Sequence, residues 1–152
     1  GPGFAAGPCL VKDTMQLAAF SQNNFVLGHA AMLINEGLPA HLVDLASRQV
    51  ELAGKTVGIL GMAFKAESDD PRDSLSYKLR KLLLFEARNV LCTDPYVEDP
   101  SLLPLETVLA QSQVLFLAVP HKTYRDLTIR PDQTLIDPWS HVQASRPASV
   151  NA

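Results

Sequence analysis

Apolar and polar residues follow two different patterns along this chain, and the change between them divides it into two parts. Over Lys12–Phe20, and again over about Phe25–Val50, apolar side chains recur mainly at helical spacing, which predicts two helical segments. After the short hinge Ala53–Lys55, short apolar runs alternate with amphipathic stretches. We therefore expect a helical part, residues 1–52, followed by a separate domain, residues 53–152.

The second helical segment contains residues that oppose a regular helix. Pro39 has no backbone N–H to donate to the preceding turn, and Gly37 lies two positions before it. We expect these residues to bend or interrupt the helix. The polar residues Ser21–Asn24 are typical of a turn and separate this segment from the first one.

The second part of the sequence predicts an alternation of strands and helices. Short apolar runs predict strands at Thr56–Leu60, Val90–Thr93, Val114–Val119 and Thr134–Ile136. The stretches between them predict helices at Ser74–Ala87, with Asp73 or Ser74 as N-cap, and at Leu105–Gln111, and a helical turn at Lys122–Leu127. This alternation predicts an α/β fold with a doubly wound parallel sheet and right-handed crossovers. The polar tail, Gln143–Ala152, is expected to be frayed.

Ligands of such sheets bind beyond the carboxyl ends of the strands. The segments expected there are Gly61–Asp73, Asp94–Asp99 and Pro120–Arg125. The first has the richest chemistry, since Lys65 offers a cation to a diphosphate, Phe64 an aromatic face and Arg72 a planar fork for phosphate or carboxylate. The residues leave a second interpretation open, in which Lys65 and Arg72 are solvated charges paired with neighbouring aspartates.

Asp94 and the four histidines receive no catalytic assignment from the sequence. Asp94 ends a predicted strand, where an acidic residue of a dinucleotide-binding fold would hold a ribose, but the following Pro95 is equally typical of a plain turn. The histidines show no metal-ligand spacing, and we expect them to be structural or surface residues. We expect no metal site.

Cys9 lies just ahead of the first helical pattern. Unpaired N–H groups and the positive end of the helix dipole favour a thiolate at such a junction, and Lys12 adds a second cation within one turn. Asp13 follows four positions later, so one helical turn could bring it to the same side as Cys9. The alternative is an ordinary helix N-terminus in which Cys9 is a small apolar filler.

Composition and charge exclude several classes of function. The net charge of −3 gives no support for binding to nucleic acid or to a membrane surface. Two cysteines, Cys9 and Cys92, form neither a disulfide framework nor a zinc pattern, which fits a reducing compartment such as the cytoplasm, and Cys92 is expected to be inert in the core. No apolar run approaches a membrane span, and no signal peptide is visible.

Two motifs resemble those of a known family. The stretch Gly3–Asp13 looks like the catalytic-cysteine signature of the UDP-glucose/GDP-mannose dehydrogenase family, with alanines in place of its paired glycines. Gly61–Lys65, followed by Asp69–Ser74, resembles a strand end and the next helix start in that family's nucleotide-sugar domain. The motifs occur in the family's order and spacing, and the similarity covers nearly the whole chain but only the second part of the family's protein.

The resemblance implies an architecture. Phe25–Val50 is similar to the family's long central helix, which builds a homodimer; a pair of ordinary core helices is the other interpretation. A Rossmann-like, UDP-binding domain with a doubly wound parallel sheet would follow this helical dimerisation segment. The family's NAD domain carries a glycine-rich fingerprint that is absent here, and we expect that domain to precede Gly1 in a longer chain.

The resemblance also implies a reaction. The family oxidises the C6 alcohol of a nucleotide sugar, usually a UDP-sugar and less often a GDP-sugar, to a carboxylate while two NAD are reduced. Cys9 would add to the aldehyde intermediate to give a thiohemiacetal and then a thioester, and Asp13 would orient or deprotonate the hydrolysing water. Lys12 and Arg72 would face NAD. The residues implied to face the nucleotide sugar are Gly3, Phe4, Phe64 and Lys65. Alone, this chain should be catalytically incomplete; the alternative is a non-catalytic nucleotide-binding or dimerisation module.

Overall fold

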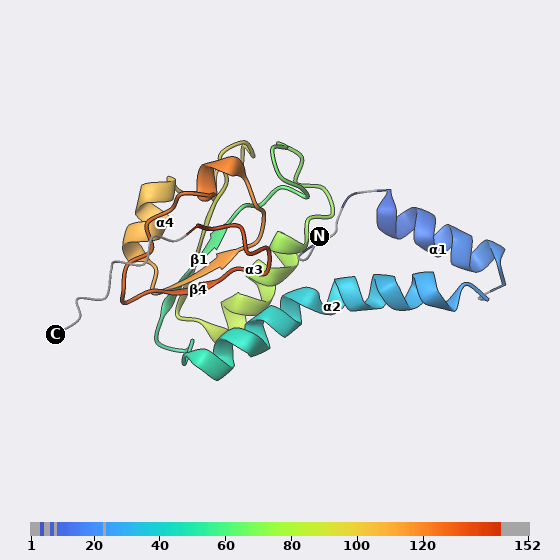
Figure 1. Ribbon diagram of the computed structural model, residues 1–152, viewed down its shortest axis with the longest axis horizontal. Helices are drawn as coiled ribbons and strands as arrows, with labels where there is room; N and C mark the ends of the chain where they lie inside the picture. Colours follow the sequence, from blue (N-terminus) through green and yellow to red (C-terminus); the bar gives the residue numbers. More distant parts are fainter. Residues whose placement is uncertain (1–3, 5–6, 8, 23, 144–152) are drawn as a thin grey trace.

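Four parallel strands form a sheet, and a helical hairpin extends from one side of it (Figure 1). The computed structural model describes residues 4, 7, 9–22 and 24–143. The strands are β1 (Thr56–Leu60), β2 (Asn89–Thr93), β3 (Val114–Leu117) and β4 (Thr134–Ile136). The helices are α1 (Leu10–Phe20), α2 (Val26–Gln49), α3 (Leu75–Glu86), α4 (Leu105–Gln111) and the short 3₁₀ helix η1 (Lys122–Tyr124). The predicted α/β fold is confirmed.

The connections between the strands make the sheet doubly wound. Its strand order is β2-β1-β3-β4, and all neighbouring strands are parallel. The chain moves outward from β1 to β2 and then crosses back over β1 to β3. Because parallel crossovers are right-handed, α3 and α4 lie on opposite faces. The connections that follow the neighbouring strands β1 and β3 leave in opposite directions, which opens a crevice at their carboxyl ends.

Alternating side chains of the strands pack into two separate cores. The core on the side of α2 and α3 includes Leu42, Val57, Ile59, Leu79 and Phe116. The core on the side of α4 and η1 includes Leu60, Val108, Leu115, Leu117 and Tyr124. Both faces of the sheet are covered, so its strands read as nearly continuous apolar runs rather than as an apolar and polar alternation.

The long helix α2 contains Pro39 and is not interrupted by it. Figure 1 shows a change of direction near the middle of this helix, so the expected bend is present. Pro39 is buried, and packing of the second half of α2 on the core maintains the helix despite the lost hydrogen bond. Lys78 of α3 donates to the carbonyl oxygen of Glu36 (2.7 Å) and to its carboxylate (3.1 Å), which adds a contact one turn before the proline.

The third strand is shorter than its apolar run predicts. The N–H groups of Ala118 and Val119 both donate to the carbonyl oxygen of Leu60, at 2.9 and 3.2 Å. Two donors on one acceptor cannot continue an evenly spaced parallel ladder, so β3 ends at Leu117. The expectation of a strand to Val119 was wrong for this reason.

Two helix starts and one turn also differ in detail from the sequence prediction. The first helix begins at Leu10 rather than Lys12, and Ser74, not Asp73, is the N-cap of α3, where its hydroxyl accepts the N–H of Ser76. The predicted turn after β3 contracts to η1. The tail prediction for residues 144–152 falls outside the described residues.

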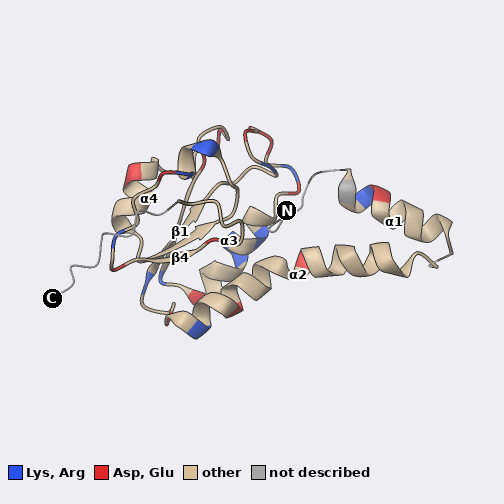
Figure 2. Ribbon diagram, viewed as in Figure 1, with Lys and Arg blue, Asp and Glu red and all other residues tan. Residues whose placement is uncertain are grey.

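The hairpin of α1 and the first half of α2 presents apolar side chains to solvent. These exposed side chains are Met15, Leu17, Phe20, Val26, Leu27, Leu33 and Ile34. Figure 2 shows few charged residues along this hairpin. An apolar surface of this kind is typical of a contact with another protein surface. In the part of the chain that the structure describes, no helix is long and apolar enough to cross a membrane.

Candidate functional site

The loop between β1 and α3, residues 61–74, lies at the carboxyl edge of the sheet. It begins at Gly61, whose φ of 95° is in the left-handed region. A Cβ atom at this position would lie 2.5 Å from Cβ of Val119 and 2.9 Å from its backbone nitrogen. Only glycine fits both the conformation and the space, so the chain can turn sharply out of β1 and across the edge of the sheet.

The inner side of this loop is held by Asp94, which follows β2. Its Oδ2 accepts the N–H groups of Met62 (2.6 Å) and Ala63 (3.0 Å), and Oδ1 accepts those of Tyr96 (2.8 Å) and Val97 (3.0 Å). Burial opposes ionisation of Asp94, yet the hydrogen bonds from His121 and from these backbone groups hold its pKa well below the usual value. This buried carboxylate is therefore a structural anion.

His121 continues the same network. Its side chain has no exposed surface; Nε2 lies 3.2 Å from Oδ2 of Asp94, and Nδ1 accepts the N–H of Glu67 at 3.0 Å. The sequence assigned neither residue a catalytic or binding role. The terminal position of Asp94 on a predicted strand was a signal for it, but His121 carried no spacing or motif that could connect it to the loop.

The outer side of the loop carries Phe64 and Lys65. The Phe64 N–H donates to the carbonyl oxygen of Asp70 (2.9 Å), and Nζ of the exposed Lys65 lies 5.3 Å from the centre of the Phe64 ring. Gly7 packs on the same ring, since a Cβ at Gly7 would meet two Phe64 ring carbons at 3.3 Å. The segment that leads into Cys9 therefore touches the loop that carries Lys65.

Arg72 forms a fork with Asp70. Its Nε lies 3.0 Å from both carboxylate oxygens, and Nη2 lies 2.7 Å from Oδ2. The hydrogen bond and charge of Asp70 raise the pKa of Arg72, and Cys9 makes a smaller electrostatic contribution of the same sign. Both partners are at the surface, so the pair corresponds to the solvated ion pair that the sequence left open.

The two cysteines differ in their surroundings. Cys9 is exposed, immediately precedes α1, and accepts the N–H of Asp13 at its carbonyl oxygen (2.8 Å). Cys92 is buried in β2, and burial raises the pKa of its thiol to about 11. Cys92 is thus inert core, as predicted, and Cys9 is the thiol that a ligand can reach.

A cleft of about 650 Å³ lies between the first turn of α1, the middle of α2 and the start of α3. Lys12, Lys78 and Lys81 contribute cations to its lining, and Glu36 and Asp73 contribute carboxylates. Its volume is in the range of sites for small molecules and cofactors. Lys12 is exposed there, 3.6 Å from Asp13, so its ammonium can reach an anion in the cleft.

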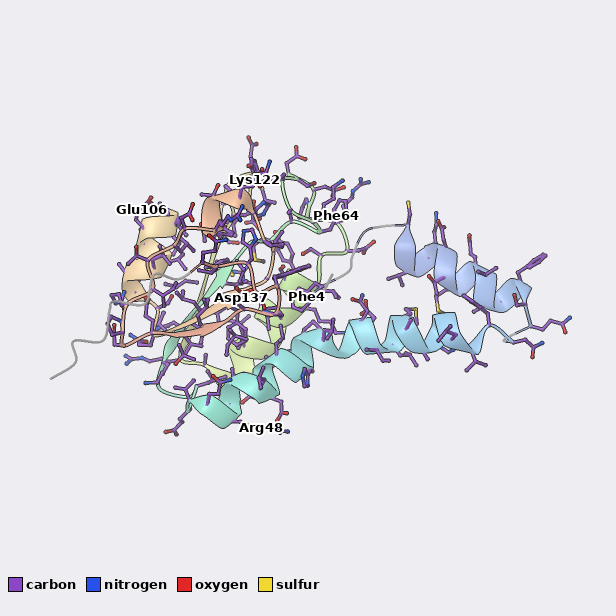
Figure 3. All side chains as sticks on the ribbon, viewed as in Figure 1. Phe4, Arg48, Phe64, Glu106, Lys122 and Asp137 are labelled. Carbon is purple, nitrogen blue, oxygen red and sulfur yellow. The ribbon has the colours of Figure 1, made fainter. Side chains whose placement is uncertain are left out.

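Two candidate residues remain, Phe4 and Gly3. Phe4 is only 7% exposed and packs in the core on the side of α2 and α3, while Figure 3 shows Phe64 on the loop at the edge of the sheet. Packing alone accounts for the Phe4 ring, and its role toward substrate stays a prediction. Gly3 lies outside the described residues. Within the described ranges, no group of three or more His, Cys, Asp or Glu side chains could hold a metal ion.

Comparisons with known proteins point to one group of enzymes. The family model for the UDP binding domain of the UDP-glucose/GDP-mannose dehydrogenase family matches residues 58–143. The UDP-N-acetyl-D-mannosamine dehydrogenase of Pyrococcus horikoshii is 29% identical over 132 residues, which cover 83% of this chain and 31% of the relative. The UDP-glucose 6-dehydrogenase of Haloferax volcanii is 36% identical over 96 residues, or 61% of this chain and 22% of the relative. The chain thus spans at most about a third of the length of these curated relatives.

Solved structures agree with this result. The crystal structure of a ternary complex of GDP-mannose dehydrogenase from Pseudomonas aeruginosa superimposes with a TM-score of 0.80 at 25% identity, over 97% of this chain and 39% of that one. A UDP-glucose dehydrogenase from Pyrobaculum islandicum gives 0.76 at 29% identity, over 90% and 34% of the two chains. The first of these superpositions covers nearly the whole chain and so includes the helical hairpin as well as the sheet.

Proposed function

This chain belongs to the UDP-glucose/GDP-mannose dehydrogenase family, and we propose that it carries the nucleotide-sugar-binding domain and the catalytic cysteine of an NAD-dependent nucleotide-sugar 6-dehydrogenase. The proposed substrate is a UDP-sugar whose C6 alcohol becomes a carboxylate. The observation that carries this proposal is the packing of Gly7 on Phe64, because it joins the segment of Cys9 to the loop of Lys65. Residues 1–52 would form the dimerisation part, and residues 53–152 the nucleotide-binding part.

The proposed roles follow from the residue types and their exposure. Lys65 is an exposed cation on the loop at the carboxyl edge, where it would bind the diphosphate while the Phe64 ring contacts the sugar or base. The exposed thiol of Cys9 would add to the C6 aldehyde to form a thiohemiacetal, which becomes a thioester after hydride loss. Asp13, one turn into α1, would orient the water that hydrolyses the thioester. A reducing compartment such as the cytoplasm would keep the thiol free.

The residues present also fit a dinucleotide beside Cys9. Lys12 lines the cleft and Arg72 lies at the surface, so cationic donors are available for the phosphates of NAD. Bound NAD would supply the hydride acceptor. The chain's own contribution would be to bind these phosphates through Lys12 and Arg72 and to hold the thiol within reach of the oxidised carbon. A dinucleotide-binding domain would have to complete the site.

A calorimetric titration of this chain with UDP and with UDP-glucose tests the proposed binding site. We expect saturable binding of both ligands below millimolar concentration, because hydrogen bonds within the chain hold the loop of Phe64 and Lys65 in place. Adenosine diphosphate serves as a control for diphosphate binding that ignores the base. Absence of binding at millimolar UDP-glucose would contradict a preformed nucleotide-sugar site.

We also propose that the hairpin of α1 and α2 forms a homodimer. Phe20 and Leu27 are 88% and 80% exposed on it, and burial of such side chains against a second copy would remove apolar surface from water. Sedimentation equilibrium should therefore show a dimer that weakens when Leu27 is replaced by lysine. A wild-type chain that sediments as a monomer at high concentration would exclude this assembly.

A further inference from the structure

Asp94 and His121 form a buried pair beneath the loop that carries Phe64 and Lys65. Neither side chain has any exposed surface, and Nε2 of His121 lies 3.2 Å from Oδ2 of Asp94. They come from the ends of β2 and β3, on the two sides of β1. Figure 3 shows Lys122, which follows the histidine, at the same edge of the sheet as Phe64. The pair therefore lies where three loops meet.

The acceptor capacity of Asp94 is used completely by N–H donors. Oδ1 receives the backbone N–H groups of Tyr96 and Val97, and Oδ2 receives those of Met62 and Ala63 as well as Nε2 of His121. An amide at this position would have to place its NH₂ group against at least two N–H donors. A carboxylate is thus required to hold Met62 and Ala63 in their present orientation.

The ring of His121 determines the other end of the same loop segment. Its Nδ1 accepts the N–H of Glu67 (3.0 Å), so this nitrogen carries no proton, and the proton on Nε2 is donated to Asp94. Glu67 has a φ of 55°, a left-handed conformation that a non-glycine residue keeps only where its surroundings hold it. The Glu67 carboxylate also contacts the residue that follows His121, since it accepts the N–H of Lys122 at 2.8 Å.

We infer that Asp94 and His121 are positioning residues for the proposed nucleotide-sugar site. Asp94 fixes Met62 and Ala63, and His121 fixes Glu67. Phe64 and Lys65 lie between these fixed points of the loop and are thereby positioned for the ligand. This inference rests on the proposed function, because it treats the loop as the one that binds the diphosphate. Both side chains are fully buried and therefore out of reach of a ligand, so their effect is transmitted through the loop.

A matched pair of aspartate variants tests the role of Asp94. Asp137 also follows a strand, precedes a proline and accepts three backbone N–H groups, those of Trp139, His141 and Val142, but it holds the segment after β4. Asp94→Asn should raise the Kd for UDP-glucose about tenfold or more, whereas Asp137→Asn should change it less than about twofold at a comparable loss of Tm. Equal losses of affinity in the two variants, or wild-type affinity in Asp94→Asn, would overturn the inference.

Two histidine variants give a graded test. The Oδ1 atom of an asparagine at position 121 can take the place of Nδ1 as acceptor for Glu67, while leucine offers no acceptor. We expect His121→Asn to retain more affinity for UDP-glucose than His121→Leu, and the amide signals of Met62 to Glu67 to shift in the same order. Identical affinities for the two variants would show that the acceptor does not matter.

A measurement on the wild-type chain does not depend on whether the variants fold. The ¹⁵N signals of the His121 ring should report a neutral ring with its proton on Nε2; a proton on Nδ1 would overturn the proposed hydrogen bond from Glu67. This measurement also separates the two proposals. If the wild-type chain binds no nucleotide sugar, the proposed function fails, while the ring tautomer and the loop amide signals still decide whether the pair sets the loop.

Discussion

Replacement of Cys9 with serine should reduce the rate of net oxidation of a UDP-sugar to its acid by about 1,000-fold or more. A thiolate adds readily to an aldehyde and leaves readily from a thioester, whereas a serine hydroxyl without a strong base does neither. Cys9 is exposed and immediately precedes α1, so its thiol is accessible to a substrate carbon. The assay requires the chain joined to a dinucleotide-binding domain and follows NADH and the uronic acid product.

The second cysteine provides the control for this variant. Cys92→Ala removes the other thiol, which lies in the core where no ligand has access. Burial raises the pKa of this thiol to about 11. We expect a modest loss of stability and unchanged oxidation. A Cys9→Ser enzyme with wild-type turnover would contradict the proposed covalent step.

Replacement of Lys65 with methionine should raise the Kd for UDP-glucose by about 10- to 100-fold, because a hydrogen bond to a charged group contributes about 1.5–3 kcal/mol. Methionine keeps an unbranched apolar stem beside the Phe64 ring, so the change is mainly the loss of the cation. Calorimetry of the two proteins measures the difference.

The control for Lys65→Met is Lys55→Met, which removes the same charge at the opposite, amino edge of the sheet, just before β1. It should leave the Kd within about twofold of the wild-type value. Equal effects of the two variants would show that the net charge of the chain, rather than the position of Lys65, determines affinity.

Much of this fold could be predicted from the sequence because its local signals agree with its tertiary contacts. β1, β4 and α4 have the predicted bounds, since each is a short run enclosed by clear turn or helix signals. The end of β3 could not be predicted, because two N–H groups compete for the Leu60 carbonyl oxygen, which is distant in the sequence. The continuity of α2 depends in the same way on packing around Pro39.

The candidate site could likewise be predicted only in part. The motifs at Cys9 and Lys65 could be identified from the sequence, and the structure brings their segments together through the contact between Gly7 and Phe64. The catalytic and binding roles of these residues stay predictions. Asp94 and His121 could not be paired from sequence, because 27 positions separate them and only the parallel sheet brings the ends of β2 and β3 to one edge.

The proposed reaction requires Cys9 to bond to an oxidised sugar carbon held by this chain. Its most direct test is the ¹³C spectrum of UDP-glucose 6-aldehyde, labelled at C6, in the presence of the wild-type chain and of Cys9→Ser. We expect a thiohemiacetal carbon signal with the wild-type chain that is absent with the variant. A wild-type spectrum that shows bound ligand but only aldehyde and hydrate carbons would contradict it.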